Sequence, residues 1–73
     1  LRSGTARLIG SRAMSLTTIT TADGGQVRLE GETWSARPYA EGVDIPAGEW
    51  VDVLQIDGVT AVVHPTTLPL SGS

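Results

Sequence analysis

Hydrophobic and polar residues alternate with a period of two along most of the chain, and glycine-containing breaks separate the short alternating runs. This period places successive side chains on opposite faces of an extended strand. The first run, residues 14–21, is rich in β-branched residues, which favour strands. The pattern predicts no helix of three turns, and it predicts five strands at about 14–22, 26–30, 32–40, 49–56 and 59–64.

The breaks between the runs differ in length and chemistry. Two short connections, at residues 30–31 and 57–58, predict hairpins, and the Asp-Gly pair in the second is a strong hairpin signal. Residues 38–48 lack the alternation because two prolines and two glycines interrupt them, which argues against a packed helix. Within this long connection, Val43 and Ile45 are expected to anchor the loop under the body of the domain.

Three strands, a long connection and a two-stranded hairpin predict an all-β fold. The favoured architecture is a five-stranded, OB-fold-like closed barrel, with an SH3-like barrel as the alternative, because closure removes exposed sheet edges. Val53 and Leu54 break the alternation, which indicates a β-bulge or a strand buried on both faces. The expected core consists of Val27, Leu29, Trp34, Ala36, Val51, Val53, Ile56 and Val62.

Composition and charge restrict the function classes. The chain has 73 residues, 40% of them hydrophobic, and no cysteine, so it suits one small domain without disulfides, cysteine-bound zinc or a thiol nucleophile. The first 22 residues hold three arginines and no acid, whereas the rest holds eight acids and two arginines. The basic start is either a juxtamembrane segment on the cytoplasmic side or a solvated tail. The acidic remainder argues against nucleic-acid binding.

We therefore expect three segments: an N-terminal arm at residues 1–13, leading toward membrane helices outside this sequence, the barrel at 14–65, and a flexible C-terminal tail at 66–73. No run of about 20 apolar residues, the length that a membrane helix needs, occurs in the sequence. Any membrane attachment would therefore come from outside these residues.

Few residues point to catalysis. His64 is the only histidine, which excludes a histidine metal cluster. It forms a formal Ser–His–Asp set with Ser35 and Asp52, but no Gly-x-Ser-x-Gly motif accompanies them, so a strand-end histidine in solvent is the favoured interpretation. Glu30 and Glu32 flank a hairpin tip and are interpreted as solvated charges rather than as acid–base or cation-binding groups. We expect no catalytic, cofactor-binding or metal-binding residue and no cofactor.

The aromatic residues are the candidates for molecular contacts. Trp34 belongs to the inward-facing set of its strand, so core filling is its expected role. Trp50 alternates out of phase with Val51, which predicts either an exposed contact residue or packing over residues 38–48. Trp50 and Tyr39 are therefore the candidate protein-contact residues.

Two motifs stand at a characteristic distance: Gly-Glu-x-Trp-x-Ala at residues 31–36 and Ile-Pro-x-Gly-x-x-Val at 45–51. Together with the segments at 25–29 and 56–58, they resemble the C-terminal soluble domain of NfeD-like proteins over about residues 8–65. The chain departs from the family pattern at residues 15–18, where Ser-Leu-Thr-Thr replaces the more usual small residue and acid, and this affects the register expected for the first strand.

The resemblance implies an OB-fold barrel without a helix between the third and fourth strands. It also implies attachment to membrane helices outside this sequence. With the basic start of the chain, the expected location is the cytoplasmic side of a bacterial plasma membrane. Its expected function is that of a non-enzymatic protein-interaction module, monomeric or weakly associated when isolated, with a stomatin- or flotillin-type partner and a link to membrane protease regulation or membrane quality control. Longer relatives carry a Ser/Lys protease domain, which this lysine-free sequence cannot reproduce. The alternative function is an OB-fold single-stranded nucleic-acid-binding domain.

Overall fold

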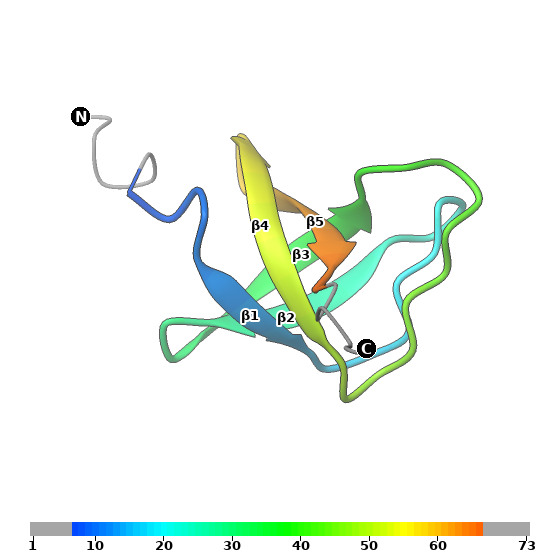
Figure 1. The fold of residues 1–73 in the computed structure, drawn as a ribbon, viewed down its shortest axis with the longest axis horizontal. Helices are drawn as coiled ribbons and strands as arrows, with labels where there is room; N and C mark the ends of the chain where they lie inside the picture. The colour runs from blue at the N-terminus through cyan, green and yellow to red at the C-terminus, as the bar shows by residue number, and fades with distance from the viewer. Residues whose placement is uncertain (1–6, 67–73) are drawn as a thin grey trace, which may run out of the picture.

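The computed structural model describes residues 7–66, which form five strands and no helix. The strands close into a barrel in the order β1-β2-β3-β5-β4 (Figure 1). Only the β3–β5 pair is parallel; the other pairs are antiparallel. This confirms the predicted OB-fold-like closed barrel without a helix between the third and fourth strands. The strand bounds are β1 Arg12–Ser15, β2 Gly25–Leu29, β3 Glu32–Pro38, β4 Trp50–Asp57 and β5 Thr60–Pro65.

The first strand differs most from the prediction, because β1 ends at Ser15 and the β-branched residues after it leave the sheet. The hydroxyl of Thr17 accepts the Gln26 N–H at 3.0 Å, in place of a ladder hydrogen bond. The backbone of Ile19 then pairs with Ile45 of the long connection in an isolated bridge. The predicted strand at 14–22 was therefore wrong beyond Ser15, since this segment finds its hydrogen bonds in a loop distant in sequence.

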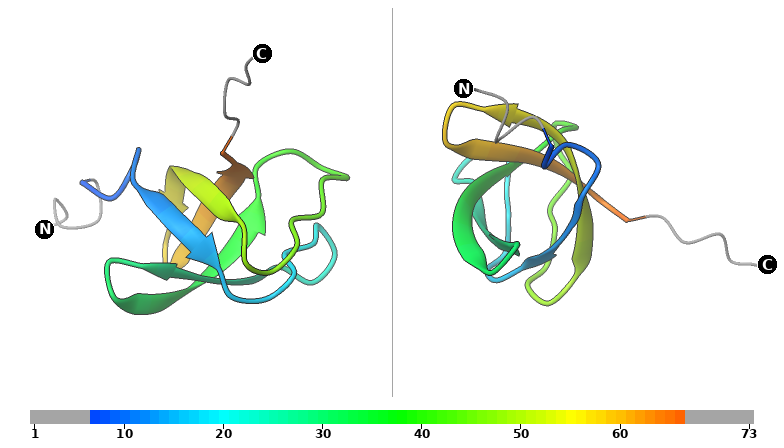
Figure 2. Two further views of the ribbon diagram at one scale, coloured as in Figure 1. Left: turned by 60° about the horizontal axis from the view of Figure 1, so that its bottom comes forward. Right: turned by 90° about the vertical axis from the view of Figure 1, so that its left-hand side faces the viewer.

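The long connection between β3 and β4 is anchored by two buried residues. Ile45 is fully buried, as the sequence predicted for this loop anchor. Ser15, also buried, donates its hydroxyl to the Pro46 carbonyl at 2.7 Å and accepts the Glu49 N–H at 2.8 Å. The connection consequently lies beside the β1–β2 loop at one end of the barrel, as both views in Figure 2 show.

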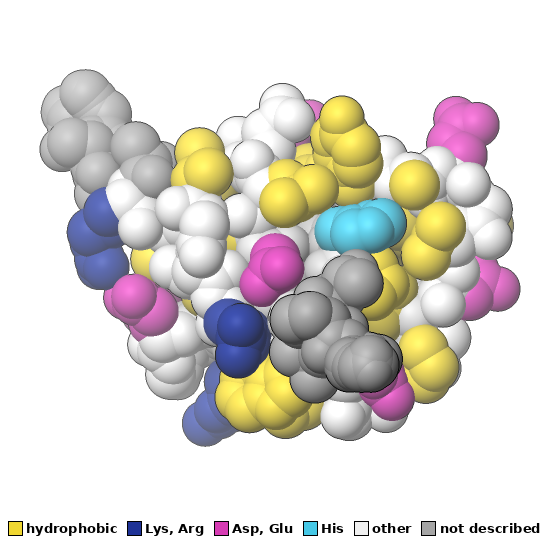
Figure 3. Space-filling view, viewed as in Figure 1, with side chains coloured by type: hydrophobic (Ala, Val, Ile, Leu, Met, Phe, Trp, Pro, Cys, Tyr) yellow, Lys and Arg dark blue, Asp and Glu magenta, His cyan; other side chains and the backbone are white. Residues whose placement is uncertain are grey.

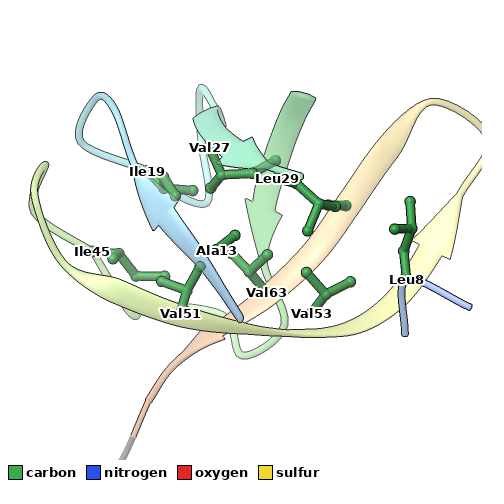
Figure 4. Close-up of a cluster of buried hydrophobic side chains, with 11 residues drawn as sticks. Leu8, Ala13, Ile19, Val27, Leu29, Ile45, Val51, Val53 and Val63 are labelled. Atoms are coloured by element: carbon green, nitrogen blue, oxygen red, sulfur yellow. The ribbon is translucent and has the colours of Figure 1, made fainter. Parts of the chain in front are cut away.

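Side chains from every strand fill the barrel (Figure 4). Leu8 packs toward one end, and Ile19 and Ile45 lie at the other. Trp34 and Ile56 are only partly buried against this cluster, unlike the full burial expected of core residues. The buried apolar residues are Leu8, Ala13, Ile19, Val27, Leu29, Ala36, Ile45, Val51, Val53, Ala61, Val62 and Val63.

Val62 is buried although it lies outside the interior cluster. It stands on the outer side of β5, between Arg37 of β3 and Gln55 of β4 in the sheet register. The Arg37 guanidinium reaches across β5 to Asp57, at 2.9 Å, and so spans the wall on which Val62 lies. The ion pair thus accounts for a buried valine on an outer surface.

The alternation break in β4 corresponds to a β-bulge. Val53 pairs with Val63 and Gln55 with Val62, so Leu54 is the extra residue and is exposed. This confirms the bulge predicted from the two adjacent apolar residues. After the bulge, Ile56 returns to the inner side of the strand.

The folded body begins before residue 14, where the sequence placed its start. Leu8 is buried, and the Gly10 N–H donates to the Val53 carbonyl at 2.7 Å. Arg7 forms an ion pair with Glu30 at 2.8 Å, so this arginine is held against the β2–β3 hairpin. Residues 7–11 therefore pack against one end of the barrel, and Arg12 and Ala13 are part of β1. The rest of the expected arm, residues 1–6, and residues 67–73 of the expected tail lie outside the described residues.

Candidate protein-contact surface

Trp50 lies on the outer wall of the barrel at the first position of β4. Its side chain is 53% exposed, whereas the next residue, Val51, is completely buried. Its neighbour across the strand pair is Met14 of β1, which is half-buried. A shallow hollow beside the indole is lined by Arg12, Glu49, Trp50 and Thr66. The structure thus leaves about half of the Trp50 side chain open to solvent at the start of β4.

Tyr39 follows the last residue of β3 and is 61% exposed. Its N–H donates to the Val63 carbonyl at 2.7 Å, which continues the parallel register by one residue and brings Tyr39 beside His64. His64 in turn pairs with Asp52, which is two residues from Trp50 on the outer side of β4. Tyr39 and Trp50 therefore share the outer wall formed by β3, β5 and β4, and one strand, β5, lies between them.

Polar side chains occupy the wall between the two aromatic residues. Asp52 accepts a hydrogen bond from the Thr66 hydroxyl at 3.1 Å and lies 3.9 Å from the Arg12 guanidinium. His64 is partly buried, and its Nδ1 atom has no hydrogen-bond partner among the described residues. In Figure 3 the single histidine lies on this face, between hydrophobic side chains and a carboxylate. The outer wall therefore has an aromatic residue at each side and a small group of polar side chains between them.

The residues of the formal Ser–His–Asp set do not converge. His64 and Asp52 are cross-strand neighbours, but Ser35 pairs with Thr60, four positions before His64 along β5. At about 3.3 Å per residue this offset is roughly 13 Å, far beyond hydrogen-bond reach. Within residues 7–66, no group of three or more histidine and acidic side chains is placed to hold a metal ion. Glu30, one of the two hairpin acids, is paired with Arg7.

Sequence reasoning missed the residues that surround Trp50. Met14 was assigned to the first strand without a role, because its neighbours depend on the pairing of β1 with β2 and β4. That pairing places Met14 directly between Trp50 and Arg28. The out-of-phase position of Trp50 was the only local signal for this surface. It predicted that the indole lies on the outer side of the wall, but it did not predict which residues lie beside it.

Known proteins with a similar sequence and fold include one protein family and two solved structures. The family model of the NfeD-like C-terminal, partner-binding domain matches residues 5–65. The chain is 40% identical to the soluble domain of a membrane protein implicated in regulation of membrane protease activity from Corynebacterium glutamicum, with a TM-score of 0.78, covering 82% of this chain and 94% of that one.

It is 30% identical to the C-terminal domain of a stomatin operon partner protein from Pyrococcus horikoshii, with a TM-score of 0.80, covering 92% of this chain and all of that one. No curated protein matches the sequence. Across residues 7–66 there is no helix long and apolar enough to cross a bilayer. The family match spans all five strands and the two motifs at residues 31–36 and 45–51. This chain therefore belongs to the family of NfeD-like C-terminal, partner-binding domains.

Proposed function

We propose that this domain is a non-enzymatic module that binds a stomatin- or flotillin-type membrane protein through the outer wall around Trp50. The domain is held at the cytoplasmic side of a bacterial plasma membrane by helices outside this sequence, and it acts in membrane protease regulation or membrane quality control. The family description and the names of the two structural neighbours support this class of partner. No described feature of the chain supports a catalytic alternative.

The observation that carries the proposal is the exposed indole of Trp50. A tryptophan that is 53% exposed on a strand, next to a shallow hollow, has a large contact area and loses little side-chain entropy on binding. Tyr39, on the same wall, supplies a second contact of the same kind. A modest affinity suffices because two proteins in one membrane meet at a high effective concentration.

The test uses the intact protein in its native membrane. We expect Trp50→Ala to reduce co-purification of the stomatin-type protein at least about fivefold, the loss typical of a contact residue at an interface centre. Val59→Ala removes a more exposed apolar side chain, 79% exposed at the β4–β5 hairpin, and serves as the control with unchanged yield. Tyr39→Ala is expected to cause a smaller loss.

Folding is checked separately by the thermal midpoint of the isolated 73-residue chain. Trp50→Ala is expected to leave this midpoint nearly unchanged because the side chain packs on the outside. Co-purification at full yield with a folded Trp50→Ala variant would show that Trp50 is not the contact residue, and the proposed binding surface would be wrong.

A further inference from the structure

The surface around Trp50 continues over β1 as an apolar strip. Met14 lies opposite Trp50 in the sheet register, and Leu16, two residues further along, is 40% exposed. The Leu16 N–H donates to the Gln26 carbonyl, so this residue still follows the edge of β2. On the face in Figure 3, hydrophobic side chains lie next to arginines at the lower edge of the molecule. Trp50, Met14 and Leu16 are thus three neighbouring apolar side chains on one outer wall, which is the apolar part of the surface considered for a partner.

Two arginines border this strip in an otherwise acidic domain. Arg28 of β2 lies opposite Met14 on the side away from Trp50, and its side chain is exposed. No carboxylate of residues 7–66 forms an ion pair with Arg28, whereas Arg7 and Arg37 each hold one at 2.8 and 2.9 Å. Arg12, two residues before Met14, has only a loose partner at 3.9 Å. Positive charge without a close partner is thus concentrated beside the strip.

The register gives this surface a definite spacing. Trp50, Met14 and Arg28 lie opposite one another on three adjacent strands. Neighbouring strands are about 4.8 Å apart, so the row spans roughly 10 Å. An α-helix laid across the strands rises about 5.4 Å per turn, so successive turns fall close to successive strands. Side chains one turn apart would meet Trp50 and Met14, and a side chain one turn further would meet Arg28.

We propose that Trp50, Met14 and Arg28 form a docking row for an acidic amphipathic helix of the partner protein. Apolar side chains at positions i and i+3 or i+4 pack on Trp50 and Met14, and a carboxylate near i+7 binds the Arg28 guanidinium in a bidentate pair. Charge complementarity favours this partner, because the unpaired Arg28 of the row supplies a cation and the acidic helix supplies the anion. This inference rests on the proposed function and adds the chemistry of its partner.

An anionic membrane would also present negative charge to Arg28, but it would spread that charge over a broad continuous surface. Glu49 lines the hollow beside Trp50, and Asp52 lies on the same wall beside Arg12. A broad anionic surface would bring its charges close to both carboxylates, whereas a single helix along the row can place its carboxylate at Arg28 and apolar side chains at Trp50 and Met14. These acids therefore favour a protein segment, and vesicle binding becomes an outcome of the test.

The experiment measures binding of the purified 73-residue chain to the soluble region of the stomatin-type protein from the same organism. We expect Arg28→Glu to weaken binding about tenfold or more, since reversal places two like charges together, and Arg28→Gln to weaken it less. Arg37→Gln makes the same chemical change at the arginine paired with Asp57 and is expected to leave affinity within about twofold. Replacing the responsible acid of the partner with lysine should restore binding to Arg28→Glu.

The outcomes separate the two proposals. Loss of binding in Trp50→Ala with full binding in Arg28→Glu would overturn the acidic-helix inference and leave the proposed function standing. A wild-type chain that binds none of the partner, here and in native membranes, would overturn both. Arg28-dependent binding to phosphatidylglycerol vesicles, in the absence of binding to the protein, would overturn the inference in favour of a membrane surface.

Discussion

Trp34 and Trp50 have the same side chain but lie on opposite sides of the barrel wall. Trp34 packs against the interior cluster and remains partly exposed beside a hollow that Val59 also lines. Trp50 stands outside, and its backbone is fixed by the ladder to Met14. The side that each indole occupies decides whether it contributes to folding or to contact.

Replacement of each tryptophan by alanine should therefore affect stability differently. We expect Trp34→Ala to lower the free energy of unfolding by about 2–3 kcal/mol, below the 3–5 kcal/mol range of a fully buried tryptophan because part of the indole is already in solvent. Trp50→Ala should cost less than about 0.5 kcal/mol. Urea unfolding followed by far-UV circular dichroism measures both variants without relying on the deleted fluorophore. Equal losses would show that the inward assignment of Trp34 is wrong.

The inward direction of the Trp34 side chain followed from a local period of two, but its incomplete burial did not. The first strand residue of β5, Thr60, pairs with Ser35, so β5 does not extend alongside Trp34. The point at which β5 begins alongside β3 depends on the pairing of two strands that are far apart in sequence. Ser15 is a similar case, because its hydrogen bonds with Pro46 and Glu49 arise only after the long connection has folded.

At the level of elements, the two short hairpins use different turns. Glu30 and Gly31 both have positive φ, at 53° and 81°, as a type I′ turn requires. In the β4–β5 hairpin the turn residues are Gly58 and Val59, and only Gly58 has positive φ, at 65°. Sequence predicted both hairpins but placed the second turn one residue early, because it assigned the Asp-Gly pair to the turn itself. Asp57 instead pairs with Thr60 as the last residue of β4.

Glu30 is the only described residue other than glycine with a positive φ, so it is a site for stabilisation. Asparagine adopts this backbone conformation more readily than glutamate, and Asn-Gly is the preferred type I′ pair. We expect Glu30→Asn to raise the free energy of unfolding by about 0.5 kcal/mol. Loss of the ion pair with Arg7 subtracts little, since its side chains are 65% and 49% exposed.

Chemical denaturation of Glu30→Asn measures this gain, with Glu32→Asn as the matched control. Glu32 is exposed and undergoes the same change of charge and chemistry, but it lies in β3 with an ordinary φ. The control is expected to be neutral or slightly destabilising because asparagine is unfavourable in strands. A destabilised Glu30→Asn would mean that the Arg7 pair contributes more than the relief of backbone strain.

Across the whole molecule, the closure of the barrel and the proposed contact surface both depend on the pairing of β1. β1 is only four residues long, yet it pairs with both β2 and β4 and so completes the wall. The same pairing creates the row of Trp50, Met14 and Arg28. The alternation of hydrophobic residues was enough to predict the barrel, whereas the row required the register of a strand whose predicted bounds were partly wrong.

Charge over the whole surface distinguishes a protein-binding barrel from one that binds single-stranded nucleic acid. A nucleic-acid groove needs several cations along a path of aromatic side chains. Here Arg7 and Arg37 are neutralised by close carboxylates, and Arg12 has a looser acidic neighbour. The partly buried Trp34 lies in a hollow that Glu32 also lines. The indole on which a base would stack therefore lies next to the negative charge of Glu32.

We expect no measurable binding of an oligodeoxythymidylate of about 15 nucleotides, the upper range of one OB-fold site, at an ionic strength of about 150 mM. The net charge of −3 repels the phosphates, and Arg28, the one arginine of residues 7–66 without an ion pair, releases too few counterions to compensate. Fluorescence anisotropy of the labelled oligonucleotide measures the binding. Glu32→Arg, which places a cation in the hollow beside Trp34, tests whether the acidic lining is what prevents binding. Micromolar binding by the wild-type chain that weakens steeply with added salt would contradict the charge argument and revive the nucleic-acid alternative.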